Sequence, residues 1–168
     1  IKGLDAAKVG VNNEDFFDFL ISKGEAFGDF EQMLLRSFYV NVTMHIESLL
    51  KLSCEFISDY KKSLFSVFEI KGNGLERYRK YIEKLTGKNF PQNEHSKLKL
   101  DTLRIIRNAI VHSDGILQKS DESTLCRYLG FFPDEFVIDG GRIILHWEGA
   151  KKLIGLHADV TRELFEIR

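Results

Sequence analysis

An arginine, an asparagine and a histidine lie close together in the chain, at Arg107, Asn108 and His112. Histidine accepts and donates protons near neutral pH, and the planar guanidinium of arginine can bind two phosphate oxygens at once. Metal-independent cleavage of RNA needs these groups and no cofactor. The 2′-hydroxyl attacks its own phosphodiester, histidine transfers protons, and arginine neutralises the charge that builds on the phosphate oxygens.

All three residues lie in a segment whose pattern predicts one helix over residues 94–113, stopped by Gly115. At about 100° per residue, polar side chains collect in one stripe of this helix. The stripe consists of Asp101, Arg104, Asn108 and His112. Arg107 instead falls among apolar positions, where a guanidinium needs a group that fixes it.

A purely structural role for these side chains is the alternative. Arg107 could pair with a carboxylate from another helix, and His112 could cap the end of its own helix. Spacing alone does not separate the two interpretations, because an arginine and a histidine at this distance are common on helices.

Residues 103–115, LRIIRNAIVHSDG, resemble the signature helix of the HEPN superfamily. The mark of that family is an arginine, commonly followed by Asn, Asp or His, and then a histidine after four to six intervening residues. Arg107, Asn108 and His112 match it with four residues between arginine and histidine. The order of predicted helices over about residues 29–168 is also similar.

The resemblance implies a metal-independent endoribonuclease with Arg107 and His112 as catalytic residues and Asn108 as the orienting polar residue. It also implies a homodimer through the 94–113 helix, whose composite cleft binds RNA. Many members act in toxin–antitoxin or phage-defence systems, so an antitoxin or other partner protein is a further expectation. Other members are non-catalytic dimerising modules that bind RNA or a protein, which is the alternative function. A family variant carries a tyrosine that a partner enzyme modifies, but Asp114 stands at that position here.

A second group of cations lies on the outer face of a shorter helix predicted over residues 75–85. The group consists of Arg77, Arg79, Lys80 and Lys84, with Tyr78 and Tyr81 interleaved. Such a face can follow a phosphate backbone and stack bases. We therefore expect these cations, together with Arg104, to bind RNA; the alternative is a solvated helix face with Tyr78 turned to the core.

The remaining elements make the predicted fold mainly all-α, an HEPN-like bundle of four to five helices with a small β-hairpin near 135–146. A short helix from Asn12 or Asn13 is expected to end in the Gly24 to Gly28 region, followed by a long helix from Asp29 with Gly72 past its end. A final helix should start near Trp147 and bury Ala150, Leu153, Ile154, Leu156, Val160, Leu164 and Ile167. We expect residues 1–12 to be a tail or lead-in and residues 13–168 to form a single domain.

The long helix is expected to bury one apolar face. That face consists of Phe30, Leu34, Phe38, Val42, Ile46, Leu49, Leu52, Phe56, Tyr60, Leu64 and Phe68. The steps of three and four between these residues are typical of a helix packed along one side.

The composition limits the function less than the motif does. A net charge of −1 over 168 residues offers no global basic field for nucleic acid, although a local patch can still bind it. Cys54 and Cys126 lie in apolar patterns without metal or redox spacing, which indicates buried, reduced thiols and a cytoplasmic protein. The scattered histidines predict no metal site, and the absence of a long apolar run or a signal-peptide pattern predicts no membrane contact.

Overall fold

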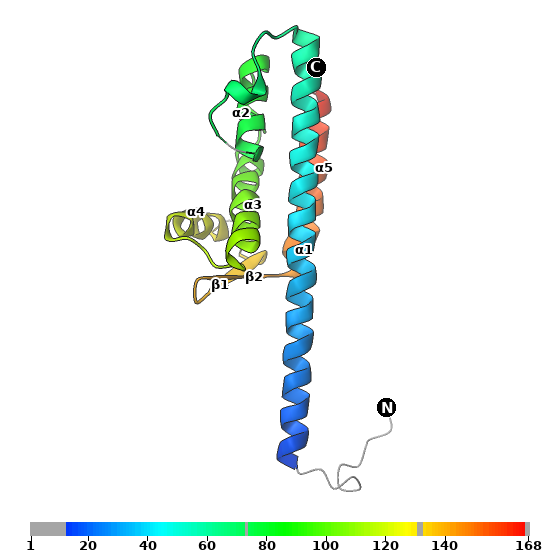
Figure 1. Ribbon diagram of the computed structural model, residues 1–168, viewed down its shortest axis with the longest axis vertical. Coiled ribbons are helices and arrows are strands. Elements are labelled where there is room, and N and C mark those ends of the chain that lie inside the picture. The colour runs from blue at the N-terminus through cyan, green and yellow to red at the C-terminus, as the bar shows by residue number, and fades with distance from the viewer. Residues whose placement is uncertain (1–12, 73, 131–132, 167–168) are drawn as a thin grey trace. The chain divides into compact units, whose positions relative to one another are not determined.

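The computed structural model describes residues 13–72, 74–130 and 133–166, and within them the chain is mainly helical (Figure 1). The elements in order are α1 (Asn13–Lys61), the 3₁₀ helix η2 (Val67–Glu69), α2 (Gly74–Thr86), α3 (Glu94–Ser113), α4 (Lys119–Leu129), β1 (Phe136–Asp139), β2 (Arg142–Leu145) and α5 (Trp147–Glu166). Helices with one small antiparallel hairpin confirm the predicted fold class. That the bundle is of the HEPN type stays a prediction.

The chain divides into two compact units, one up to Leu34 and one from Leu35 on. In the first unit the described residues form the first part of α1, and the second unit contains all the other elements. The predicted lead-in over residues 1–12 falls outside the described residues. Within the described residues, no helix combines the length and the apolar character that crossing a bilayer requires.

The first two predicted helices are one helix, α1, which ends earlier than expected. Gly24 and Gly28 lie within it, since a glycine inside a helix costs only about 1 kcal/mol and no proline or cap accompanies either one. At the other end, Lys62 takes a left-handed conformation with φ 51°, directly after the last helical residue. The expected end near Gly72 is therefore wrong, and Leu64 and Phe68 lie outside the helix.

The buried face of α1 agrees with the predicted one only in part: Ile46 is fully buried, and Phe38 and Val42 pack half-buried against the core. The buried side chains are Leu35, Tyr39, Thr43, Ile46, Leu50, Cys54 and Ile57. By contrast Leu52, Phe56 and Tyr60 are 60%, 65% and 72% exposed. The helix thus carries two apolar faces, and the rest of the second unit covers only one of them.

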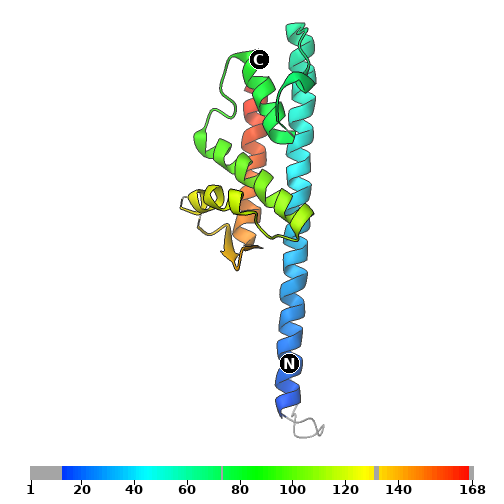
Figure 2. The ribbon, with the colours of Figure 1, turned by 60° about the vertical axis from the view of Figure 1, so that its left-hand side comes forward.

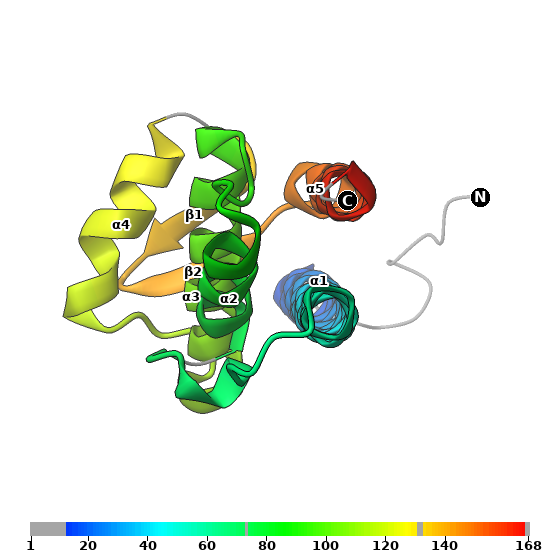
Figure 3. The ribbon, with the colours of Figure 1, turned by 90° about the horizontal axis from the view of Figure 1, so that it is seen from above.

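In the second unit α3 contacts α2, α4 and α5 (Figure 2). The part of α1 from Leu35 on lies beside α5 (Figure 3), where the rings of His45 and His157 stack with their centroids 4.8 Å apart. The largest side chains of the core come from several elements: Tyr81, Phe90, Phe136, Leu35, Ile46, Leu50, Ile82, Ile106, Leu125, Ile143, Leu145 and Val160.

The hairpin has the predicted place, and the structure gives its register. Phe136 pairs with Leu145 and Asp139 with Arg142, which leaves Gly140 and Gly141 as a two-residue turn. Both glycines have positive φ, at 53° and 80°, as the tight turns that match strand twist require. This turn explains why the sequence pattern locates the hairpin so well.

Helix α4 was not predicted, and α5 differs in one detail. Leu125 and Tyr128 are the buried side chains of α4, too few to produce a recognisable period. α5 begins at Trp147 as predicted, but Ile154, expected in the core, is 59% exposed. Ile167, also expected there, falls outside the described residues.

Candidate functional site

Helix α3, which carries the predicted catalytic residues, has the predicted bounds. The Asn93 side chain caps its first turn by accepting a hydrogen bond of 2.8 Å from the backbone of His95. At the other end Asp114 has the left-handed conformation, with φ 49°, and the Gly115 N–H bonds to the carbonyl of Ala109 at 2.9 Å. These caps fix where the helix ends and therefore where the side chains of its last turn emerge.

The guanidinium of Arg107 is held by its neighbour in the chain. Its Nη1 donates a hydrogen bond of 3.0 Å to Oδ1 of Asn108, and both side chains are half-buried. Its Nε is buried without a hydrogen-bond partner among the described residues. No carboxylate pairs with Arg107 there, so this half-buried arginine keeps donors for an anion that reaches it.

The imidazole of His112 lies in the last turn of α3 and is exposed. Within the described residues no hydrogen bond joins it to Arg107, whose Nη1 donates to Asn108. Arg107 and His112 lie on the same helix, about 7.5 Å apart along its axis at 1.5 Å per residue. A phosphodiester of RNA and its neighbouring riboses are large enough to touch both.

A pair of arginines clamps the residue that ends α3. Arg36 of α1 binds Oδ1 of Asp114 at 2.8 Å, and Arg142 of β2 binds Oδ2 at 3.2 Å. Gly115 has φ 82°, and a Cβ on it would lie 3.1 Å from Nη2 of Arg36. Glycine at this position therefore allows the positive φ of the turn and leaves room for the guanidinium of Arg36.

The hairpin is tied by its backbone to the segment that follows α3. The N–H of Ile143 bonds to the carbonyl of Gly115, and the N–H of Leu117 bonds to the carbonyl of Gly141, both at 2.9 Å. Ile116 and Arg142 form an isolated bridge between these bonds. The hairpin, which the sequence pattern leaves as an appendage, thus helps to fix the end of α3.

The predicted RNA-binding cations of α2 all have partners within the chain. Arg79 pairs with Glu83 at 3.5 Å and Lys80 with Glu76 at 2.5 Å. Arg77 donates a hydrogen bond of 2.8 Å from Nε to the carbonyl oxygen of Gly72, and its guanidinium lies over the Phe68 ring. Nζ of Lys84 lies 3.7 Å from the centroid of the Phe65 ring. These contacts lower the charge that α2 offers to RNA, but they do not test whether RNA binds there.

Arg104, the remaining predicted RNA-binding residue, is half-buried on α3. The hydrogen bond from Lys80 lowers the pKa of Glu76, and the charge of Arg104 lowers it further. Arg104 therefore interacts with the acidic side chain of α2 that also pairs with Lys80.

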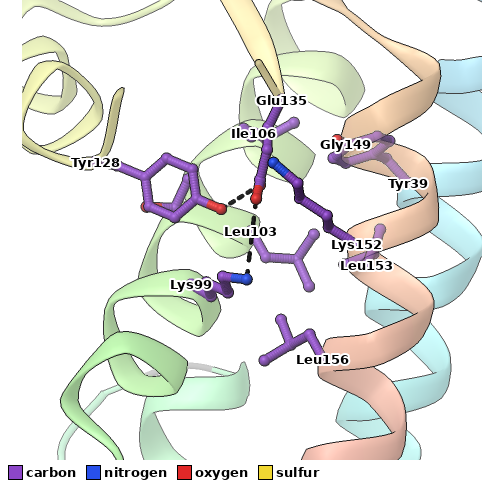
Figure 4. A pocket seen from close by; sticks show the side chains of 11 residues that line it. Tyr39, Lys99, Leu103, Ile106, Tyr128, Glu135, Gly149, Lys152, Leu153 and Leu156 are labelled. Carbon is purple, nitrogen blue, oxygen red and sulfur yellow. Dashed lines mark hydrogen bonds and ion pairs between the residues drawn. The ribbon is translucent and has the colours of Figure 1, made fainter. Parts of the chain in front are cut away.

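A buried carboxylate, Glu135, forms a second polar cluster that the sequence pattern does not reveal. Figure 4 shows it between Tyr128 of α4, which donates a hydrogen bond to Oε2, and Lys99 of α3, whose Nζ lies 3.9 Å from Oε1. Burial raises the pKa of Tyr128, and the hydrogen bond to Glu135 raises it further. The pocket beside these groups is about 20 Å³, room for roughly one water molecule, so the cluster joins elements and does not hold a substrate.

The structure also brings together groups that the sequence pattern treats as scattered. Nδ1 of His45 and Nε2 of His157 lie 2.7 Å apart, within hydrogen-bond distance. No group of three metal-ligating side chains gathers within the described residues. Cys54 is buried, and burial raises the pKa of its thiol to about 12, whereas Cys126 is exposed, which makes the expectation of a buried thiol wrong there.

Comparison with known proteins does not place the chain in a family. No family model, no curated protein and no solved structure matches it. The class of the protein therefore rests on the residues of α3 and their surroundings.

Proposed function

We propose that the chain is a metal-independent endoribonuclease of the HEPN type, with Arg107, Asn108 and His112 as its reactive group. The observation that carries the proposal is the state of Arg107. It is half-buried, no carboxylate pairs with it in the described residues, and the carboxamide of Asn108 orients it. This arrangement suits a guanidinium that awaits a phosphate better than one whose role is to stabilise the fold.

In the proposed reaction the 2′-oxygen of a ribose forms a bond to the adjacent phosphorus, and the bond from phosphorus to the 5′-oxygen breaks. A proton leaves the 2′-hydroxyl, and a proton is delivered to the departing 5′-oxygen. His112 transfers protons in these steps, and Arg107 stabilises the charge on the two non-bridging oxygens. The products are a 2′,3′-cyclic phosphate and a 5′-hydroxyl.

The surroundings of α3 support a site completed by a second copy. Val111 in the last turn of α3 and Ile116, just past its end, are 47% and 49% exposed. A second α3 packed there would cover this apolar surface and bring two copies of Arg107 and His112 together. The cytoplasmic location, the antitoxin or partner protein and the toxin–antitoxin or phage-defence setting belong to the same proposal.

The test is cleavage of tRNA and of poly(U) by the wild-type chain in EDTA, with the ends of the products identified. We expect 2′,3′-cyclic phosphate ends, and a loss of at least about a hundredfold in rate in each of Arg107→Ala and His112→Ala. His95→Ala on the same helix and Arg162→Ala on α5 are matched controls that should keep the activity.

Two outcomes would overturn the proposal. Equal cleavage by the wild type and by both variants would show that the cleavage comes from elsewhere. No cleavage of either RNA by the wild type would leave the alternative, a non-catalytic module that binds RNA or a protein partner, as the better description.

A further inference from the structure

The described residues of the first unit form a helix, and the apolar side chains of this helix from Ile21 to Leu34 are exposed. Every side chain from Ile21 to Glu31 is exposed. Phe27, Phe30 and Leu34 are 72%, 54% and 43% exposed, and at 100° per residue they lie within about 60° of one another around the helix. Because helices without tertiary packing are marginal in water, this apolar face needs a partner.

The second unit has a groove of matching character between α1 and α5. Its volume is about 580 Å³. The residues that line it are Leu49, Leu52, Ser53, Phe56, Ile57, Tyr60, Lys61, Thr161, Leu164 and Phe165. Phe56 and Phe165 are 65% and 66% exposed, so most of the surface of these two rings faces solvent. A groove between two helices with such a lining suits the apolar face of a third helix.

Charge favours an acidic occupant. Residues 1–34 carry a net charge of −4 and residues 35–168 a net charge of +3, which together make the −1 of the chain. Within the described helix the imbalance is larger, since residues 13–34 contain six carboxylates and one lysine. Lys61 lies in the lining of the groove, and Glu31 is a neighbour of Phe27 and Leu34 on the helix surface. Opposite net charges attract at long range and favour this pairing over a random one.

We propose that the helix containing Phe27, Phe30 and Leu34 of one copy docks in the α1–α5 groove of a second copy. The three side chains have the i, i+3, i+7 spacing by which helices anchor in apolar grooves. The contact covers two exposed apolar surfaces of one protein with each other. It uses none of Arg107, Asn108 and His112, so it stands or falls independently of the ribonuclease proposal.

The test is binding of a fluorescein-labelled peptide of residues 13–34 to the full chain, followed by fluorescence anisotropy. The chain is kept dilute so that its own helices do not fill the groove. We expect saturable binding that weakens as salt is raised, and at least a tenfold loss of affinity in the groove variant Phe56→Ser/Phe165→Ser. The same loss is expected when the peptide carries Phe27→Ser/Phe30→Ser.

Ile154→Ser is the matched control, because Ile154 is an exposed apolar residue of α5 outside the groove lining. It should bind the peptide as the wild type does. Tyr60→Ser, a single change at a 72% exposed side chain, serves if the double variant fails to fold. The proposal is overturned if the wild type does not bind the peptide, or if the groove variants bind it as tightly as Ile154→Ser does.

Discussion

Replacing Gly149 by alanine is expected to destabilise the protein, against the usual effect of that change in a helix. Gly149 lies in the first turn of α5 and is buried. A Cβ there would overlap the hydroxyl of Tyr39 and the carbonyl oxygen of Glu135, and it would lie 3.1 Å from the carbonyl carbon of Glu135. That carbonyl accepts a hydrogen bond of 3.2 Å from His146, so it cannot move without disturbing the junction between hairpin and helix.

The magnitude follows from two opposed effects. Alanine is favoured over glycine in a helix by about 1 kcal/mol. Inserting a methyl group where there is no space costs about 1–3 kcal/mol, and the upper part of the range applies because one of the obstructing groups is backbone. Gly149→Ala should therefore lose about 1–2 kcal/mol of unfolding free energy.

Gly155 provides the matched control on the same helix, because nothing lies within 4 Å of a Cβ built there. Gly155→Ala should gain about 0.5–1 kcal/mol. The assay is urea unfolding followed by far-UV circular dichroism for both variants. Equal stability of the two variants would refute the reasoning, since it would mean that α5 can shift away from Tyr39 and Glu135 at no cost.

Three further measurements test other contacts. Burial, with the charge of Glu135 nearby, raises the pKa of Tyr39, and burial with the Glu135 hydrogen bond raises that of Tyr128. Their contribution to stability is complete below the unfolded pKa of about 10 and is lost as the pH rises, so both phenols should resist ionisation in an ultraviolet titration until the chain unfolds. Burial and the charge of His45 lower the pKa of His157. The contribution of His157 to stability is therefore complete above about pH 6.5 and is lost as the pH falls. We expect His157→Gln to lose less unfolding free energy than the wild type between about pH 7 and 5. Asn93→Ala removes the cap of α3 and should cost about 1 kcal/mol in urea unfolding.

The results that would contradict these expectations are specific. Tyrosines that all titrate together in the folded protein would exclude the buried cluster around Glu135. An unchanged pH dependence in His157→Gln would show that the histidine pair contributes nothing to stability. An Asn93→Ala variant as stable as the wild type would mean that tertiary packing alone fixes the start of α3.

Local signals predict some elements well and others not at all. The bounds of α3 and the hairpin follow from caps and turn glycines that act within a few residues, at Asn93, Gly115 and Gly140-Gly141. α4 escapes prediction because Leu125 and Tyr128 are its buried residues, and two positions do not define a period.

The buried face of α1 could be predicted only in part because the helix is apolar on two sides. The most hydrophobic stripe, with Phe56 and Tyr60, suggests the core, yet the buried stripe includes Tyr39 and Thr43. Thr43 can be buried in the core because its hydroxyl donates a hydrogen bond of 2.6 Å to the carbonyl oxygen of Tyr39. Which stripe is covered depends on where α3 and α5 pack, and no local pattern in α1 contains that information.

For the candidate site, the sequence locates the helix and the reactive side chains but not what holds them. The hydrogen bond from Arg107 to Asn108 joins adjacent residues. The clamp on Asp114 joins Arg36 and Arg142, which lie on α1 and β2 far from each other in the chain. Contacts of this kind depend on the assembled fold and give no periodic signal.

The backbone hydrogen bond between Leu117 and Gly141 has a consequence for local opening of the structure. This hydrogen bond closes a loop of the chain that contains α4 and β1. A second backbone hydrogen bond, from Ile143 to Gly115, lies next to it. Because these two bonds do not involve α4, we expect a local opening of α4, which would break the contact of Tyr128 with Glu135, to leave the end of α3 in place. Amide exchange should then be faster in α4 than in α3, and changes of length within the loop should leave the presentation of His112 intact.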